Sequence, residues 1–143
     1  KDVRNKFQEE INRTGYSQLN TMGLIACQVA YEHGSSWLNE LIGYLVGNID
    51  FIRTCLREHL PKIKLVEPEG TYLVWLDFNE LGLNEELLED LIVNKAKLWL
   101  DSGTMFGPEG KGFQRINIAC PRAVLEKGLL QLEKAIIIGS GRK

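Results

Sequence analysis

The segment Thr71-Tyr72-Leu73-Val74-Trp75-Leu76-Asp77-Phe78 decides the fold class of this chain. It combines β-branched and aromatic residues and is apolar on both faces, which predicts a strand in the middle of a sheet. The preceding Pro68-Glu69-Gly70 is typical of a turn, and Ile63-Lys64-Leu65-Val66 before it predicts a shorter strand. Together these runs indicate that the second half of the chain is built around a sheet.

A helix is expected directly downstream of this segment. Asn84 is a typical N-cap, and Glu85 and Glu86 after it suit the positive end of a helix dipole. Lys95 and Lys97 suit the negative end, so the helix is expected to end near them. Its inner face is predicted to carry Leu87, Leu88, Leu91 and Ile92.

The remaining downstream segments complete the sheet and cover it. We expect a short strand at residues 98–100, a glycine-rich loop at 102–112 and a strand at 113–119. Pro121 is expected at the first position of the last helix, and residues 139–143 are expected to form a frayed tail. The inner stripe of the last helix is predicted to be Leu125, Leu129, Leu132 and Ile136.

Three helices are expected upstream of the sheet. Residues 3–14 predict a polar helix, and residues 19–32 predict a helix so apolar that it must be buried or lie at an interface. Gly34 is expected to stop that helix in a left-handed conformation. Residues 36–59 predict a helix spanning roughly 37 Å, long enough to connect two bodies. Its apolar stripe is Leu38, Leu41, Leu45, Ile49, Ile52 and Leu56.

The order of these elements, three helices followed by β-β-α-β-β-α, predicts an α+β fold in which helices cover one face of a small sheet. The compact α+β domain is expected over residues 61–138, with residues 35–60 as the long connecting helix. Residues 1–34 are expected to belong to a separate body.

The composition excludes several classes of protein. The chain has 143 residues, 44% of them hydrophobic, which disfavours disorder. Its 17 Lys and Arg residues do not outnumber its 19 Asp and Glu residues, so we expect no nucleic-acid partner. Glu40 and Asp50 flank and interrupt the most apolar stretch, so we expect no membrane span.

The cysteines indicate the cellular compartment of the protein, and the first residues indicate whether the chain is part of a longer protein. Cys27, Cys55 and Cys120 are odd in number and far apart, which favours reduced thiols in a cytoplasmic protein over disulfides or a metal site. The chain starts with Lys1-Asp2-Val3, without Met or a signal peptide, so we expect it to be part of a longer protein.

The glycine-rich loop does not match a phosphate-binding loop. A Walker A motif ending at Gly110-Lys111 would need glycine where Met105 stands and Ser or Thr where Gly112 stands. Two interpretations remain open: a plain connector between two strands, or a lip beside a binding site.

Arg115 is the strongest candidate for a binding residue. It lies in the middle of a predicted strand between apolar neighbours, so its guanidinium needs an anionic partner or access to water. Its planar fork suits a carboxylate bound through two parallel hydrogen bonds. The alternative is an arginine on an edge strand paired with a surface Glu, which is the commoner arrangement.

Three separate motifs then point in one direction. They are the Gly-x-x-Phe-Gly run of residues 103–107, the Arg-x-Asn run of residues 115–117, and Cys120-Pro121-Arg122, in addition to residues 68–78. In this combination the chain from Val3 to Ile136 resembles the C-terminal part of class I/II pyridoxal-phosphate (PLP) aminotransferase-fold enzymes. The branch it resembles is that of the cystathionine β-lyases, which are carbon–sulfur lyases.

The resemblance implies a substrate-binding role for four residues. Arg115 corresponds to the arginine that holds the α-carboxylate of the amino-acid substrate. Phe106 and Gly107 correspond to the loop beside that site, and Tyr72 to a residue of the strand that faces it. In this branch, PLP acts as the electron sink, a sulfur leaving group departs from Cβ, and ammonia and pyruvate follow.

The resemblance also implies a homodimer and a division of the chain between two domains. Tyr16 and Asn20 correspond to a loop that reaches across the dimer interface towards the neighbouring active site. Residues 1–34 correspond to the last helices of the large PLP-binding domain, residues 35–60 to the connector, and residues 61–138 to the small C-terminal domain.

One departure from the family limits what this chain can do. The lysine that binds PLP covalently belongs to a Ser-x-x-Lys-type segment, and none of the ten lysines here has that context. We therefore expect no catalytic residue in this chain and no activity from it alone. Three alternatives stay open: an aminotransferase of the same family, a regulatory module that binds an amino acid without reaction, and an interaction domain that dimerises through residues 19–30.

Overall fold

The computed structural model of the chain describes residues 1–15 and 19–140. The chain divides into two compact units, Lys1–Leu41 and Ile42–Lys143, and the division falls inside the long helix α3 (Ser35–His59). The domain limits expected from the sequence remain predictions.

The first unit contains helices α1 (Asp2–Thr14) and α2 (Thr21–His33), and neither has a buried residue. The side chain of Asn20 accepts a hydrogen bond from the Gly23 N–H at 2.7 Å. Asn20 is therefore the N-cap of α2.

Gly34 does not stop α2 in the left-handed conformation expected from the sequence. Its φ is −81° and its ψ is −4°, which is right-handed helical. Its N–H donates to the carbonyl of Ala30 at 2.9 Å, and its own carbonyl accepts from the N–H of Leu38 at 3.0 Å. The helical hydrogen bonding of α2 therefore passes through Gly34 into α3.

The second unit begins with the remainder of α3, which has one buried face. The buried members of the predicted stripe are Leu45, Ile52 and Leu56. The fourth buried position is the polar Asn48, whereas the predicted Ile49 is half-buried. Leu38, at the start of the predicted stripe, is 49% exposed.

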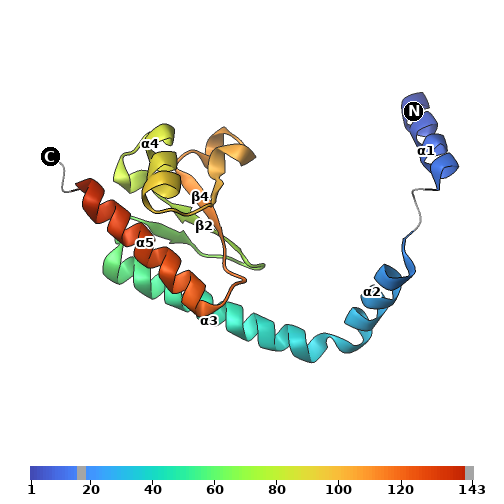
Figure 1. The fold of residues 1–143 in the computed structure, drawn as a ribbon, viewed down its shortest axis with the longest axis horizontal. Coiled ribbons are helices and arrows are strands. Elements are labelled where there is room, and N and C mark those ends of the chain that lie inside the picture. The colour runs from blue at the N-terminus through green and yellow to red at the C-terminus, as the bar shows by residue number, and fades with distance from the viewer. Residues whose placement is uncertain (16–18, 141–143) are drawn as a thin grey trace. The chain divides into compact units, whose positions relative to one another are not determined.

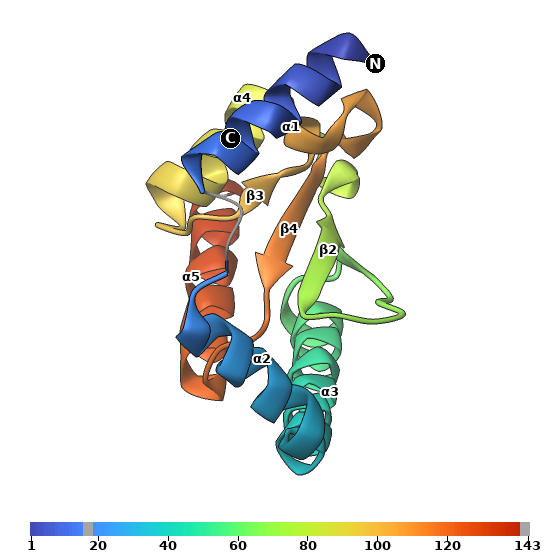
Figure 2. The same cartoon turned by 90° about the vertical axis from the view of Figure 1, so that its right-hand side faces the viewer.

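Four short strands form one antiparallel sheet in the order β1-β2-β4-β3. The strands are β1 (Lys64–Val66), β2 (Leu73–Asp77), β3 (Asp101–Ser102) and β4 (Phe113–Asn117). The inner strands are β2 and β4, which lie side by side in Figure 2. The prediction of a central strand within residues 71–78 is confirmed.

The strand predicted at residues 98–100 is wrong, because the third strand is the two-residue β3. Residues Asp90–Lys95 form a π-helical turn, and the N–H of Leu98 donates back to the carbonyl of Ile92 at 2.9 Å. Trp99 is 87% exposed. The backbone at Leu98 is therefore bonded to the preceding helical turn, and pairing with the sheet begins only at Asp101.

The helix predicted after Asn84 is present as α4 (Glu85–Glu89) followed by the π-helical turn. Its cap is confirmed, because Oδ1 of Asn84 accepts from the N–H of Leu87 at 2.9 Å. The predicted inner residues Leu88, Leu91 and Ile92 are buried. Leu87 is 49% exposed, so the prediction for that residue is wrong.

The last helix, α5 (Arg122–Ser140), starts one residue later than predicted and includes two residues of the expected tail. Pro121 precedes it, and the Pro121 carbonyl accepts from the N–H of Val124 at 2.9 Å. The proline therefore caps the helix from outside. Residues 141–143 lie outside the described part of the chain.

Helices α3 and α5 run parallel along the same face of the sheet (Figure 1). Near the start of α5, the Tyr44 hydroxyl accepts from the N–H of Arg122 at 2.7 Å. Further along, Nδ1 of His59 lies 3.1 Å from Oε1 of Glu133. Large side chains buried in this unit include Phe78, Ile52, Leu76, Leu88, Ile92, Ile118 and Leu132. The predicted α+β fold is confirmed.

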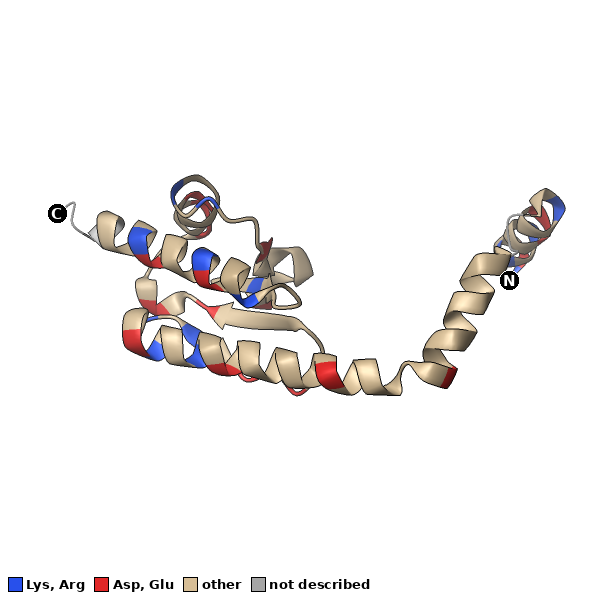
Figure 3. Ribbon diagram, turned by 60° about the horizontal axis from the view of Figure 1, so that its bottom comes forward, with Lys and Arg blue, Asp and Glu red and all other residues tan. Residues whose placement is uncertain are grey.

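Charged residues of both signs are interspersed along α5 and the C-terminal half of α3 (Figure 3). Arg53 bonds Glu67 at 2.8 Å, which raises the pKa of Arg53 and lowers that of Glu67. Among the described residues, no helix is both long and apolar enough to cross a membrane.

Candidate functional site

The register of the sheet brings three side chains together on the face away from α3 and α5. Arg115 of β4 lies opposite Trp75 of β2 on one side and opposite Asp101 of β3 on the other. Directly opposed residues in an antiparallel pair point to the same face. Arg115 is therefore on an inner strand, and the interpretation of it as an edge-strand arginine is wrong.

The guanidinium of Arg115 is held on two sides. Its Nε and Nη2 donate to Oδ2 of Asp101 at 3.1 and 2.7 Å. Its Cζ lies 4.4 Å from the centre of the Phe106 ring, which in turn meets Trp75 edge-on at 5.2 Å and 86°. An acid and an aromatic wall thus fix this cation, with a side chain that keeps 25% of its surface exposed.

The exposed part of Arg115 leaves hydrogen-bonding capacity for a ligand. A guanidinium has five N–H donors, and the bonds to Asp101 use one from Nε and one from Nη2. Within the described residues, Nη1 of Arg115 has no protein hydrogen-bond partner. The Nη1–Nη2 edge therefore offers two parallel donors, the arrangement that binds a carboxylate.

The glycine-rich loop is built to hold Phe106 in this position. Gly107 has φ 135° and ψ 170°, a conformation that side chains rarely adopt. Gly103 and Gly110 pack backbone against backbone so closely that a Cβ on either would overlap the other. Because the loop folds on itself and sets Phe106 against Arg115, these contacts favour the interpretation of the loop as a lip beside a site.

In the described part of the chain no contact with Arg115 is seen for Tyr72, and the other two predicted site residues, Tyr16 and Asn20, belong to the first part of the chain. Tyr72 is 47% exposed, and its carbonyl accepts from the N–H of Ile118 at 2.9 Å. Tyr16 lies outside the described residues, and the side chain of Asn20 caps α2. Their roles in binding a substrate or crossing a dimer interface remain predictions.

Sequence reasoning missed Asp101 and Trp75. Trp75 lies in a predicted strand and Asp101 directly follows one, but the register that sets them opposite Arg115 cannot be read from these segments. The signal that could have found Asp101 is its position, since it is the last charged residue before the loop that leads into the strand of Arg115.

A buried amide fixes the far end of β4. The Nδ2 of Asn48 donates to the carbonyls of Ile118 at 2.8 Å and Cys120 at 3.2 Å. The Oδ1 of Asn48 accepts from Nε of Arg122 at 2.8 Å, and Arg122 stacks over Phe51 at 4.8 Å. Helix α3 thereby holds both the chain that leaves β4 and the first residue of α5.

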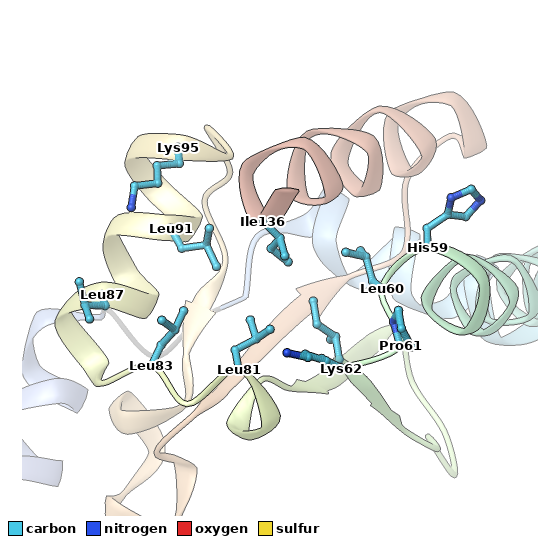
Figure 4. Close-up of a pocket in the computed structure, with 11 residues that line it drawn as sticks. His59, Leu60, Pro61, Lys62, Leu81, Leu83, Leu87, Leu91, Lys95 and Ile136 are labelled. Atoms are coloured by element: carbon cyan, nitrogen blue, oxygen red, sulfur yellow. The ribbon is translucent and has the colours of Figure 1, made fainter. Parts of the chain in front are cut away.

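A hollow of the second unit is separate from Arg115. It has a volume of about 600 Å³ and lies between the end of α3, α4 and the end of α5 (Figure 4). Its walls are mostly apolar and include Leu60, Leu81, Leu83 and Leu91. No cluster of His, Cys, Asp or Glu able to hold a metal ion occurs within the described residues.

Comparison with known proteins assigns the chain to a group. No family model matches the chain. It is 38% identical over 133 residues to cystathionine β-lyase PatB of Bacillus subtilis, which covers 93% of this chain and 34% of that protein. It is 36% identical over 124 residues to protein MalY of Escherichia coli, covering 87% of this chain and 32% of that protein. The chain is a homologue of the cystathionine β-lyases.

Solved structures agree with this assignment. Cystalysin of Treponema denticola, which contains PLP, matches with TM-score 0.85 and 33% identity over 96% of this chain and 35% of its own. A PLP-bound protein of Clostridium difficile matches with TM-score 0.84 and 43% identity over 90% of this chain and 33% of its own. The fold is that of the C-terminal domain of PLP-dependent aminotransferase-fold proteins.

The Clostridium difficile protein is itself described as an aminotransferase, whereas the sequence matches to other aminotransferases are shorter. The aspartate aminotransferase of Pyrococcus horikoshii is 30% identical over 79 residues, which is 55% of this chain and 20% of that protein. The chain spans about a third of the length of the lyase homologues that it matches.

The residues around Arg115 suit a carboxylate and do not by themselves form a site for PLP. The cofactor's aldehyde needs a lysine amine, and its phosphate needs cations or a group of N–H donors. The charged group bonded to Arg115 is the acidic Asp101, and its other neighbour is aromatic. Lys64 and Lys95 form ion pairs elsewhere, with Glu80 and Asp90.

Proposed function

We propose that this chain is the C-terminal part of a PLP-dependent carbon–sulfur lyase that acts on cystathionine- or cysteine-type amino acids. Its contribution is the binding of the substrate α-carboxylate by Arg115. The observation that carries this proposal is the geometry of Arg115, held between Asp101 and Phe106 with two parallel N–H donors on its free edge.

The residues of this chain then act by binding and orientation. The Nη1 and Nη2 groups of Arg115 each donate one hydrogen bond to the α-carboxylate, so the plane of the carboxylate follows the plane of the guanidinium. Phe106 keeps that plane fixed and shields one face of it from water. A substrate that is held in this way presents its Cα and Cβ in one orientation, and orientation of this kind accelerates a reaction.

The sequence relatives favour the lyase reaction over transamination, although the Clostridium difficile protein, which is 43% identical over 90% of the chain, is described as an aminotransferase. The relatives that are 36–38% identical match 87–93% of the chain, whereas the aspartate aminotransferase matches 55% of it. PLP, a homodimer and a cytoplasmic location belong to the proposed whole protein. The three free cysteines support a reducing compartment.

The 143-residue chain alone is expected to form no pyruvate. None of its ten lysines has the sequence context of the cofactor-binding lysine. This prediction is checked by incubating the chain with PLP and cystathionine and assaying pyruvate. Pyruvate at the rate of the lyase homologues would contradict it.

The decisive experiment replaces Arg115 in the full-length protein. With PLP present, Arg115→Ala is expected to lower kcat/KM for cystathionine by about 100-fold or more, because the carboxylate loses a bidentate, charged partner. Arg115→Lys is expected to fall in between, since lysine is a point charge without the fork. The matched control is Arg57→Lys on the exposed side of α3.

Two results would overturn the proposal. One is a full-length wild-type protein that shows no visible absorption from bound PLP and releases no pyruvate. The other is an Arg115→Ala variant with unchanged kinetics. Amino-acid binding without pyruvate would favour the regulatory module, and transfer of the amino group to a keto acid would favour the aminotransferase.

A further inference from the structure

Asp101 is a built-in counter-ion of Arg115. Strand β3 pairs Asp101 directly with Arg115, and one of its carboxylate oxygens accepts both hydrogen bonds from the guanidinium. Asp101 itself keeps 40% of its side-chain surface exposed. Backbone pairing therefore keeps a negative charge beside the cation before any ligand arrives.

This pairing has a geometric and an electrostatic consequence. Geometrically, Asp101 takes the Nε side of the guanidinium and leaves the Nη1–Nη2 edge for a ligand. Electrostatically, the pair has no net charge, so a ligand carboxylate on the free edge gains two hydrogen bonds but little long-range attraction. A second carboxylate on the same ligand finds no surplus positive charge and is repelled by Asp101.

We propose that Asp101 is a specificity-determining residue that makes the Arg115 site select ligands without a second uncompensated carboxylate over ligands that carry one. The substrate class is then an amino acid whose side chain carries no net negative charge. This inference rests on the proposed function in one respect only, namely that Arg115 binds the carboxylate of the ligand.

The test uses two non-reacting probes of four carbons each, butyrate and succinate, on the 143-residue chain. Binding is followed by NMR at the Nε–Hε resonance of Arg115, assigned by its loss in Arg115→Lys. The ionic strength is held at the same value for both probes by balancing with NaCl, because salt screens exposed charges. The wild-type chain is expected to bind butyrate at least as tightly as succinate, although succinate carries twice the charge.

Two substitutions separate the charge of Asp101 from its hydrogen bonds. Asp101→Asn keeps an oxygen that can accept from Arg115 but removes the charge, and it is expected to raise the affinity for succinate relative to butyrate about tenfold. Asp101→Ala removes both, and it is expected to raise the same ratio while weakening both ligands. The matched control, Asp90→Asn, removes an acid from the ion pair with Lys95 and should leave the ratio unchanged.

Several outcomes overturn the inference. An equal gain in affinity for both probes in Asp101→Asn would show that Asp101 competes with every carboxylate for Arg115 and does not discriminate between them. An unchanged ratio, or no binding of either probe to the wild-type chain at 100 mM, would also overturn it. If the variants do not fold, the wild-type chain still decides, because a preference for succinate over butyrate contradicts the proposal.

A kinetic comparison keeps this inference separate from the lyase proposal. The full-length protein is assayed with S-propyl-L-cysteine and S-(2-carboxyethyl)-L-cysteine, which differ in the distal carboxylate. Asp101→Asn is expected to raise kcat/KM for the carboxylated substrate about tenfold relative to the other. Failure to release pyruvate from either substrate would overturn the proposed lyase reaction. The ratio of the affinities for succinate and butyrate would still test the role of Asp101.

Discussion

The two units of the chain treat their apolar side chains in opposite ways. In the second unit, Phe78 and Ile52 are 1% and 0% exposed. In the first unit, Leu24, Ile25 and Val29 of α2 are 49–52% exposed, and no residue of α1 or α2 is buried. The contrast teaches that local sequence can specify a helix, whereas it does not specify which surface covers the apolar face of that helix.

The largest difference between the units should be seen in a pair of truncations. Phe78→Ala is expected to lower the free energy of unfolding of the second unit by about 3–5 kcal/mol, because it leaves a cavity in a packed core. Ile25→Ala is expected to change it by less than about 0.5 kcal/mol. Urea denaturation followed by tryptophan fluorescence measures both. A comparable loss for Ile25→Ala would mean that α2 is packed against a partner in solution.

Buried and exposed asparagines give the next test of the contrast. Asn48→Ala is expected to cost about 2–3 kcal/mol, because two backbone carbonyls and Arg122 lose a buried partner. Asn94→Ala, which removes an exposed bond to Asp90, is expected to cost less than about 0.5 kcal/mol. Both values come from urea denaturation at pH 7. Equal values would show that the amide of Asn48 does not hold β4 to α3.

A substitution in the loop beside Arg115 is expected to have a smaller effect on the stability of the second unit. Gly107→Ala is expected to cost about 1–2 kcal/mol, because alanine at φ 135° is strained. Gly70→Ala is the matched control, since a Cβ there meets nothing within 4 Å. Thermal unfolding reports the stability, and the ring-shifted Trp75 resonances report whether Phe106 has moved. Unchanged resonances in Gly107→Ala would show that the loop does not position Phe106.

The smallest expected effect is a pH dependence at the surface of the second unit. Arg53 lowers the pKa of Glu67, so the folded protein binds that proton less readily than the unfolded chain. The stabilisation is therefore complete above the ordinary glutamate pKa and is lost as the pH falls through the lowered value. Glu67→Gln is expected to flatten the fall of the urea midpoint between pH 7 and pH 3. An identical profile in the variant would show that the pair contributes nothing.

Much of the fold was predictable because its signals are local. The Asn84 cap, the central strand within residues 71–78 and the long helix all depend on residues close together in sequence, and each is present. The apolar run at 98–100 predicts a strand, and this prediction is wrong because the preceding π-helical turn leaves no pattern in the sequence. The prediction that Gly34 stops the helix is wrong because Gly34 makes helical hydrogen bonds with residues of both neighbouring helices.

The candidate site was predictable only in part. Arg115, Phe106 and Gly107 followed from their motifs, and the structure brings Phe106 against the guanidinium. Asp101 and Trp75 did not, because a strand's register against its neighbours depends on non-local pairing.

The Asn48 amide has a consequence for the order in which the chain folds. Its bond to the Ile118 carbonyl joins residues 70 positions apart, so a long loop must close before the bond can form. During synthesis, α3 has left the ribosome well before its hydrogen-bonding partner, the Ile118 carbonyl just after β4, exists. The strand that carries Arg115 is therefore fixed late, and we expect Asn48→Ala to speed unfolding far more than it slows folding.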